Sequence, residues 1–229
     1  MTPTKIHELL IDSPLAMSMG PALTTTSYAI LGLLSVRPWS TYELAQQMDR
    51  SLGRIWPRAQ SKLYEEPKKL VRHGLAEATR EAVGRRPRTV YRITAEGRRA
   101  LADWLPEPSA GPVLESEQLL KVFFADSGTR ADTLATLRGA RAWAEERNQG
   151  NAATAHAHLA GEAPFPERAA QTLLVGRFLT DYYRLVATWA EWATAIVEQW
   201  PDDPADAAPD PEELVEVLRR ASWSATDKA

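Results

Sequence analysis

The stretch from Arg54 to Leu75 constrains the fold of this chain more than any other. Its apolar residues recur at nearly helical spacing, which allows one face of a helix to be buried. They are Leu63, Leu70, Val71 and Leu75. The other face is polar and basic, and its side chains can donate hydrogen bonds to anionic or polar partners. Gly74 supplies the left-handed residue at which helices commonly end. The stretch therefore predicts an amphipathic helix over about residues 54–74.

A basic hairpin is predicted directly after this helix. Residues 75–83 and 89–94 have the composition of strands, and Tyr91 and Ile93 alternate with polar neighbours in the second one. The turn between them carries three arginines, which are Arg85, Arg86 and Arg88. Guanidinium groups at such a tip can pair with phosphates or enter a narrow minor groove of DNA. The alternative is a charged loop that contacts only solvent.

Two further helices are predicted before the basic stretch. Residues 24–36 begin with a threonine cap and are apolar nearly all round, which is typical of a helix at the centre of a core. Ser40 or Thr41 caps a second helix that runs to about Leu52, with Glu43 favourably placed in its first turn. Three short helices followed by a basic hairpin form the layout of a winged helix-turn-helix, in which a late helix enters the major groove of DNA.

Several short motifs stand in the order that is typical of the PadR family of transcriptional regulators, which this chain resembles. The motifs are Ser27–Leu34 (SYAILGLL), Thr41–Leu44 (TYEL), Leu63-Tyr64, Lys68–Leu70, Gly74-Leu75 and Tyr91–Gly97 (YRITAEG). The resemblance covers about residues 24–105. Beyond Pro106 the chain resembles only the general plan of the family, a variable helical dimerisation domain. The resemblance implies a winged domain that binds DNA and a helical half that pairs two copies.

One position departs from the pattern of that family. Three residues after Tyr64, where the family usually has an apolar residue, this chain has Pro67. Proline inside a helix costs about 3 kcal/mol and usually kinks the helix. We therefore expect the third helix either to bend after Tyr64 or to begin later than residue 54.

The two halves of the chain differ in charge. Residues 21–105 hold 15 Lys and Arg against 8 Asp and Glu, whereas residues 106–229 hold 11 against 20. The net charge of the whole chain, −3, conceals this difference. Such asymmetry suggests a module that faces a polyanion joined to an acidic module, and the alternative is an uneven distribution of solvated charges.

These features predict a surface that contacts double-stranded DNA, with a pseudo-palindromic operator as the target of a homodimer. The expected contacts come from the second helix, the third helix and the hairpin. They are Thr41, Arg58, Gln60, Ser61, Lys62, Tyr64, Lys68, Arg85, Arg86 and Arg88. For Tyr64 the alternative is a tyrosine at the edge of the core.

The second half is predicted to be helical. A fourth helix, capped by Thr94, ends near Leu105, and the proline-rich residues 106–112 form a connector. Helices are then expected near residues 115–126, 129–159, 167–200 and 212–221. The predicted fold is mainly α, with an N-terminal arm over 1–22 that is disordered or caps the dimer and a winged helix-turn-helix with a two-stranded β wing over 23–105. A C-terminal helical dimerisation domain follows over 113–229, and sensing of an effector by this domain is left open.

An aromatic stripe runs along the predicted helix at 167–200. Its members step by four and three residues, which is the spacing of a helix seam. They are Phe178, Tyr182, Leu185, Trp189, Trp192 and Ile196. The family resemblance implies that such a half can bind a flat aromatic effector, to which Trp143 would also contribute. A dimer seam and an effector pocket are both compatible with this spacing.

Other function classes find little support in the sequence. The chain has no cysteine, and its few histidines lack the spacing of metal ligands or of a catalytic site, so we expect neither metal, cofactor nor enzymatic activity. Its apolar runs are shorter than a membrane span, and it opens on no secretory leader, so we expect a cytoplasmic protein that is not bound to membranes. The expected function is a transcriptional repressor. The alternative is a helical protein-interaction module whose winged domain docks a protein partner rather than DNA.

Overall fold

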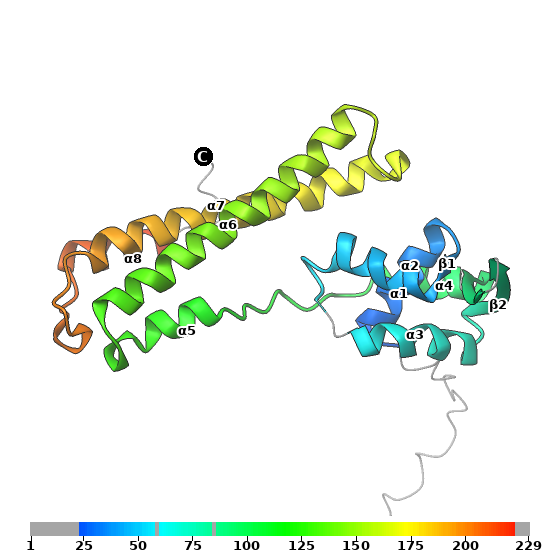
Figure 1. Ribbon diagram of the computed structural model, residues 1–229, viewed down its shortest axis with the longest axis horizontal. Coiled ribbons are helices and arrows are strands. Elements are labelled where there is room, and N and C mark those ends of the chain that lie inside the picture. Colours follow the sequence, from blue (N-terminus) through cyan, green and yellow to red (C-terminus); the bar gives the residue numbers. More distant parts are fainter. Residues whose placement is uncertain (1–22, 58–59, 84–85, 223–229) are drawn as a thin grey trace, which may run out of the picture. The chain divides into compact units, whose positions relative to one another are not determined.

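The computed structural model of this chain describes residues 23–57, 60–83 and 86–222 (Figure 1). Contacts divide the chain into two compact units, Met1–Gly111 and Pro112–Ala229. The described part of the first unit combines helices with a small sheet, and that of the second unit is helical. The predicted fold class, mainly α with an N-terminal winged helix-turn-helix followed by helices, is confirmed.

The helices of the first unit begin at side-chain caps that are visible in the sequence. Helix α1 (Thr25–Val36) starts with a capping box in which Thr24 and Ser27 bond each other's backbone N–H. Helix α2 (Thr41–Gln47) starts with the same device from Ser40 and Glu43 and continues as a π-helical turn, Met48–Leu52. Helix α4 (Ala95–Trp104) is capped by Thr94.

Helix α3 (Gln60–Arg72) differs from its predicted bounds because it begins near residue 60 rather than 54. Pro57 disfavours helical backbone at Trp56, so a helix could not run through that position without cost. Pro67 lies inside α3 and is fully buried. Of the two outcomes expected for this helix, the later start is therefore the one observed.

The sheet has three antiparallel strands in the order β1-β3-β2. Strand β2 (Ala76–Val83) and strand β3 (Arg86–Ile93) form the predicted hairpin, with Ala76 opposite Ile93. Strand β1 (Trp39–Ser40) was not predicted, since two residues are too few to show alternation. It places Trp39 opposite Tyr91 and so ties the start of α2 to the wing.

Residues of α1 form the centre of the first unit. Ile30, Leu31 and Leu34 are almost fully buried, as are Leu44 of α2 and Leu70 of α3. The helix that the sequence marks as apolar nearly all round is thus the one that the other elements surround. Helices α3 and α4 both pack against α1.

Gly97 has a packing role in this unit. A Cβ atom built on Gly97 would lie 2.1 Å from the carbonyl oxygen of Leu75. Only glycine allows the first turn of α4 to approach the start of the wing so closely. Gly74, at the end of α3, has a φ of 70°, which is the left-handed conformation expected there.

The second unit is built on a long antiparallel helical hairpin (Figure 1). Its members are α6 (Arg130–Leu159) and α7 (Ala169–Val197), and two shorter helices accompany them, α5 (Glu117–Phe123) and α8 (Pro211–Ala221). Single 3-10 turns lie at Ala125–Ser127, Pro166–Arg168 and Pro204–Asp206. None of the helices in the described ranges is long and apolar enough to cross a membrane.

Small side chains line the contact between α6 and α7. Ala140 and Ala144 of α6 are buried, as are Ala190 and Ala193 of α7. Asn151 adds a polar contact: its Nδ2 atom donates to the carbonyl oxygen of Gly176 at 2.8 Å and to the hydroxyl of Thr180 at 2.6 Å. Small residues allow the two backbones to approach closely, and the buried amide favours one register of the hairpin.

Candidate nucleic-acid interface

The outer side of α3 carries a strip of polar side chains. Tyr64 is 38% exposed, and Lys68, one turn later on the same side, is exposed as well. Leu63, Pro67 and Leu70 are buried on the inner side. The amphipathic pattern predicted for this stretch is therefore the one that the helix displays.

Lys68 forms a surface ion pair with Glu65. Its Nζ atom lies 2.8 Å from Oε1 of Glu65, and both side chains are more than half exposed. The hydrogen bond between them lowers the pKa of Glu65 and raises that of Lys68. An exposed pair of this kind is worth little in water, so an incoming phosphate can replace the carboxylate at small cost.

The other residues expected to contact DNA are distributed between the two helices and the wing. Three of them form the first turn of α3, namely Gln60, Ser61 and Lys62. Thr41 is the first residue of α2, a helix that packs against α3. Arg86 is the first residue of β3. Arg58 and Arg85 lie outside the described residues.

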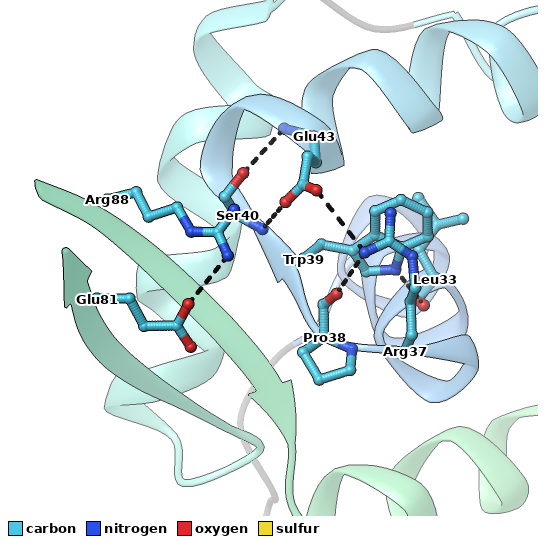
Figure 2. Close-up of polar contacts among 8 residues, drawn as sticks. All are labelled: Leu33, Arg37, Pro38, Trp39, Ser40, Glu43, Glu81 and Arg88. Atoms are coloured by element: carbon cyan, nitrogen blue, oxygen red, sulfur yellow. Dashed lines mark hydrogen bonds and ion pairs between the residues drawn. The ribbon is translucent and has the colours of Figure 1, made fainter. Parts of the chain in front are cut away.

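Figure 2 shows a charged cluster at the start of α2. The guanidinium carbon of Arg37 lies 3.5 Å from the centre of the Trp39 ring, which is a cation–π contact. Arg37 also donates to the carbonyl oxygen of Pro38 at 3.1 Å and lies 3.7 Å from the carboxylate of Glu43. Arg37 was not among the predicted site residues, although it stands two residues before Trp39, close enough in the chain for its side chain to stack on the ring.

The carboxylate of Glu43 is held in its charged form. Its Oε2 atom accepts from the backbone N–H of Ser40 at 2.8 Å. Hydrogen bonds from Ser40, first from its side chain and then from its backbone, lower the pKa of Glu43, and the nearby charge of Arg37 lowers it further. The cluster therefore fixes the start of α2, where Thr41 stands.

Arg88 lies in strand β3 rather than in the turn that was predicted for residues 84–88. The strand is longer than expected because the ladder places Arg88 opposite Glu81, and the two side chains pair at 3.0 Å (Figure 2). Opposite charges facing each other across two strands stabilise their pairing. The guanidinium of Arg88 thus already has a carboxylate partner within the wing.

The aromatic stripe lies on a side of α7 next to the one that packs against α6. The buried residues of α7 are Leu179, Tyr183, Ala190, Ala193 and Val197. Three members of the stripe are exposed, namely Phe178, Leu185 and Trp192, which recur every seven residues. The remaining three, Tyr182, Trp189 and Ile196, are half-buried between the two sides. The stripe therefore flanks the internal packing of this unit.

Trp143 joins the stripe to the interior of the hairpin. Its ring meets those of Tyr182 and Tyr183 edge to face, with centroids 6.3 and 5.6 Å apart. Further along α7, Nε1 of Trp192 donates to Glu213 of α8 at 3.0 Å. The structure thus brings Trp143 together with Tyr182, whereas Trp192 is held by α8.

The first unit has the fold of a winged helix-turn-helix: three helices around a core, followed by a β hairpin and a fourth helix. Residues 30–103 match the family model described as transcriptional regulator PadR-like family. This part of the chain is therefore similar to the PadR-like family.

Two curated proteins are similar to part of this chain. "Negative transcriptional regulator PadR" of Bacillus subtilis (strain 168) is 31% identical over 107 residues, which are 46% of this chain and 59% of that protein. "Probable transcriptional regulator Rv1176c" of Mycobacterium tuberculosis is 34% identical over 114 residues, which are 49% and 58% of the two chains. The matched part thus spans less than two thirds of the length of these relatives.

Solved structures resemble a larger share of the chain. The structure of Bacillus subtilis PadR in complex with operator DNA matches with a TM-score of 0.66 and 23% identity, covering 76% of this chain and 99% of that one. The same protein in complex with p-coumaric acid matches with a TM-score of 0.59 and 24% identity, covering 76% and 95%. At such identities the likeness concerns the fold.

Proposed function

We propose that this chain is a sequence-specific DNA-binding regulator that represses transcription as a homodimer in the cytoplasm. The observation that carries the proposal is the polar outer side of α3, with Tyr64 and Lys68, in a winged unit whose fold matches a structure bound to operator DNA. In this fold a late helix is the element that enters the major groove.

The two basic elements of the winged unit would have different tasks. Side chains of α3 would contact base edges, which carry the sequence information, while wing arginines would contact phosphates. Because each phosphate contact releases counterions, affinity should fall steeply as salt rises. Residues 21–105 contain 15 basic and 8 acidic residues, and this excess of positive charge supports contacts with phosphates.

Pairing of two copies would determine the length of the operator that the regulator recognises. We propose residues 23–105 as the DNA-binding domain and residues 113–229 as the dimerisation domain. The exposed part of the stripe, Phe178, Leu185 and Trp192, supports a second copy as the partner because such an apolar strip is costly in water. Two winged units would then contact successive major grooves about 34 Å apart, on a pseudo-palindromic operator.

A small aromatic effector would act through the helical half. One relative has been crystallised with p-coumaric acid, and this chain places Trp143 against Tyr182 and Tyr183. Edges and faces of such rings suit a flat ligand. The ligand would relieve repression if it bound better to a dimer whose two α3 helices no longer fit the operator, because only differential binding shifts an equilibrium.

Gel shift of the chain's own promoter region at two salt concentrations tests the proposal. We expect specific retardation that weakens strongly at the higher salt concentration. Absence of retardation at low salt would contradict DNA binding and favour a protein partner. Two variants separate the tasks of the elements: Arg58→Ala should relax sequence preference, whereas Arg86→Ala should weaken binding to all duplexes about equally.

A further inference from the structure

The first turn of α1 is hydrogen-bonded to the segment that contains α3 at two places. Nε1 of Trp56, just before α3, donates to the hydroxyl of Thr26 at 3.1 Å. The hydroxyl of Ser27 donates to Oε2 of Glu66, in the middle of α3, at 2.6 Å. One hydrogen bond before the first turn of α3 and one after it thus join this segment to α1, which is far away in the sequence.

The bond between Ser27 and Glu66 is the stronger of the two by its chemistry. Ser27 is fully buried, and its single proton is directed at a carboxylate. A hydrogen bond to an ionised acceptor is about twice as strong as a neutral one. The oxygen of Ser27 meanwhile accepts from the backbone N–H of Thr24 at 3.1 Å, so the bond to Glu66 continues the capping box of α1.

Glu66 also places a negative charge at the N-terminus of α1. The first turn of α1 contains no acidic residue of its own. A helix N-terminus carries a partial positive charge, which a nearby carboxylate stabilises. α3 therefore supplies to α1 the acidic group that α1 lacks, and in return its own position becomes fixed relative to α1.

Glu66 acts from the side of α3 that faces away from the proposed contact strip. Tyr64 and Lys68 are each two residues from Glu66, about 200° around the helix. Glu66 is half-buried, whereas Tyr64 and Lys68 are exposed. A change at Glu66 would thus alter where α3 lies without removing a group from the surface that meets DNA.

We propose that Ser27 and Glu66 are positioning residues that set the placement of α3, and thereby the operator preference of the winged unit. This inference rests on the proposed DNA binding. Contacts to base edges tolerate small shifts poorly because hydrogen bonds weaken with misalignment, whereas phosphate contacts by flexible basic side chains tolerate them.

The chain offers a matched control at the neighbouring position. Glu65 is exposed on the same helix, and Glu65→Ala removes the same charge as Glu66→Ala. Binding of each full-length variant to operator and scrambled duplexes is measured by fluorescence anisotropy well below the midpoint of thermal unfolding. Operator and scrambled duplexes are first defined by selection from a random pool with the unaltered chain.

We expect Glu66→Ala to lower the ratio of operator affinity to scrambled-duplex affinity about tenfold. Glu65→Ala frees Lys68 for the phosphates of either duplex and should leave that ratio unchanged. Ser27→Ala should have a similar effect. Ser27→Ala also removes the cap bond from the backbone N–H of Thr24. The double variant should bind the operator no more weakly than Ser27→Ala alone, because either single change already breaks the bond between Ser27 and Glu66. Equal behaviour of Glu66→Ala and Glu65→Ala, equal losses on both duplexes, or additive losses would overturn the proposal.

A readout without DNA separates this inference from the proposed function. Amide hydrogen exchange over residues 60–72 should be faster in Glu66→Ala than in Glu65→Ala, because α3 is less firmly held. The unaltered chain could prefer no DNA sequence while Glu66→Ala still exchanges faster than Glu65→Ala. That result would contradict the proposed DNA recognition but uphold the role of Glu66 in holding α3 against α1. Unchanged exchange would refute the positioning role. Should Glu66→Ala fail to fold, Glu66→Gln keeps the length of the side chain and removes its charge.

Discussion

The two units of this chain differ in how completely they bury their own apolar side chains. Among the described residues, large apolar side chains that remain exposed number 4 in the winged unit and 17 in the helical unit. The winged unit surrounds α1 with helices and a sheet, so little apolar surface is left over. The helical unit is a long hairpin with two short helices, and many of its large apolar side chains are exposed among its described residues.

The arrangement within α7 makes the difference sharper. Its buried positions are Leu179, Tyr183 and Val197 together with the small residues Ala190 and Ala193, while the large Phe178, Leu185 and Trp192 are exposed. A hairpin folded for isolation would gain more by burying the large side chains. The winged unit covers most of its own apolar side chains, whereas the exposed side chains of the helical unit support the proposed pairing with a second copy.

The largest effect is expected from a charge in the exposed stripe. Leu185→Glu would place a carboxylate in the proposed contact between copies, where an unpaired charge is strongly unfavourable. We expect the dimer to dissociate at least about 100-fold more readily. Sedimentation equilibrium measures this, with Ala195→Glu on another exposed side of α7 as the control. A dimer equally stable in both variants would remove the stripe from the interface.

Unfolding of each unit by itself tests whether only the helical unit depends on a second copy for stability. Residues 112–229 alone should unfold at a midpoint that depends on protein concentration, with about 1.4 kcal/mol gained for each tenfold rise. Residues 23–111 should unfold at one temperature whatever the concentration. Thermal unfolding followed by circular dichroism over a hundredfold concentration range provides the measurement. Concentration dependence of the winged unit instead would reverse our account of the two units.

The winged unit should owe part of its stability to Glu43. Because folding lowers the pKa of this carboxyl, its stabilisation is present above its ordinary value of 4.5 and is lost as the pH falls through the folded value. Glu43→Ala should cost about 1 kcal/mol at pH 7, and the difference from the unaltered chain should shrink as the pH falls below the ordinary pKa of 4.5. Urea unfolding of residues 23–111 at pH 7 and below this pKa tests this, with the exposed Glu77→Ala as the control; a difference that persists at low pH contradicts it.

A smaller effect, in the opposite direction, is expected in the wing. Glu81 pairs with Arg88, so Glu81→Gln should release the guanidinium for a phosphate and raise DNA affinity a few fold. Glu77→Gln removes the same charge elsewhere on β2 and should raise affinity less. Anisotropy titrations with one duplex compare them. Equal gains would mean that overall charge, rather than the release of Arg88, explains the change.

Much of the fold could be predicted because caps and periodicity are local. Thr24, Thr94 and Thr129 stand where α1, α4 and α6 begin, and each bonds a backbone N–H of its own helix. β1 could not be predicted, since Trp39 and Ser40 become a strand only by pairing with Tyr91 and Val90. The late start of α3 follows from Pro57, which the amphipathic pattern alone does not take into account.

The candidate site was harder to predict because it depends on the register of the strands and on which face of each helix packs inward. The partner of Arg88 follows from the alignment of β2 with β3, and that of Glu66 from the packing of α3 on α1. In α7, two neighbouring sides are both apolar, and periodicity does not say which of them meets α6. The residue types indicated a basic winged unit, but not which cations already have acidic partners.

Selection of duplexes from a random DNA pool by the full-length chain would show whether two winged units bind one operator. We expect enrichment of a pseudo-palindrome whose half-sites are about one helical turn apart, bound less tightly as salt rises. Enrichment of no sequence, or of one unrepeated half-site, would contradict a paired winged regulator.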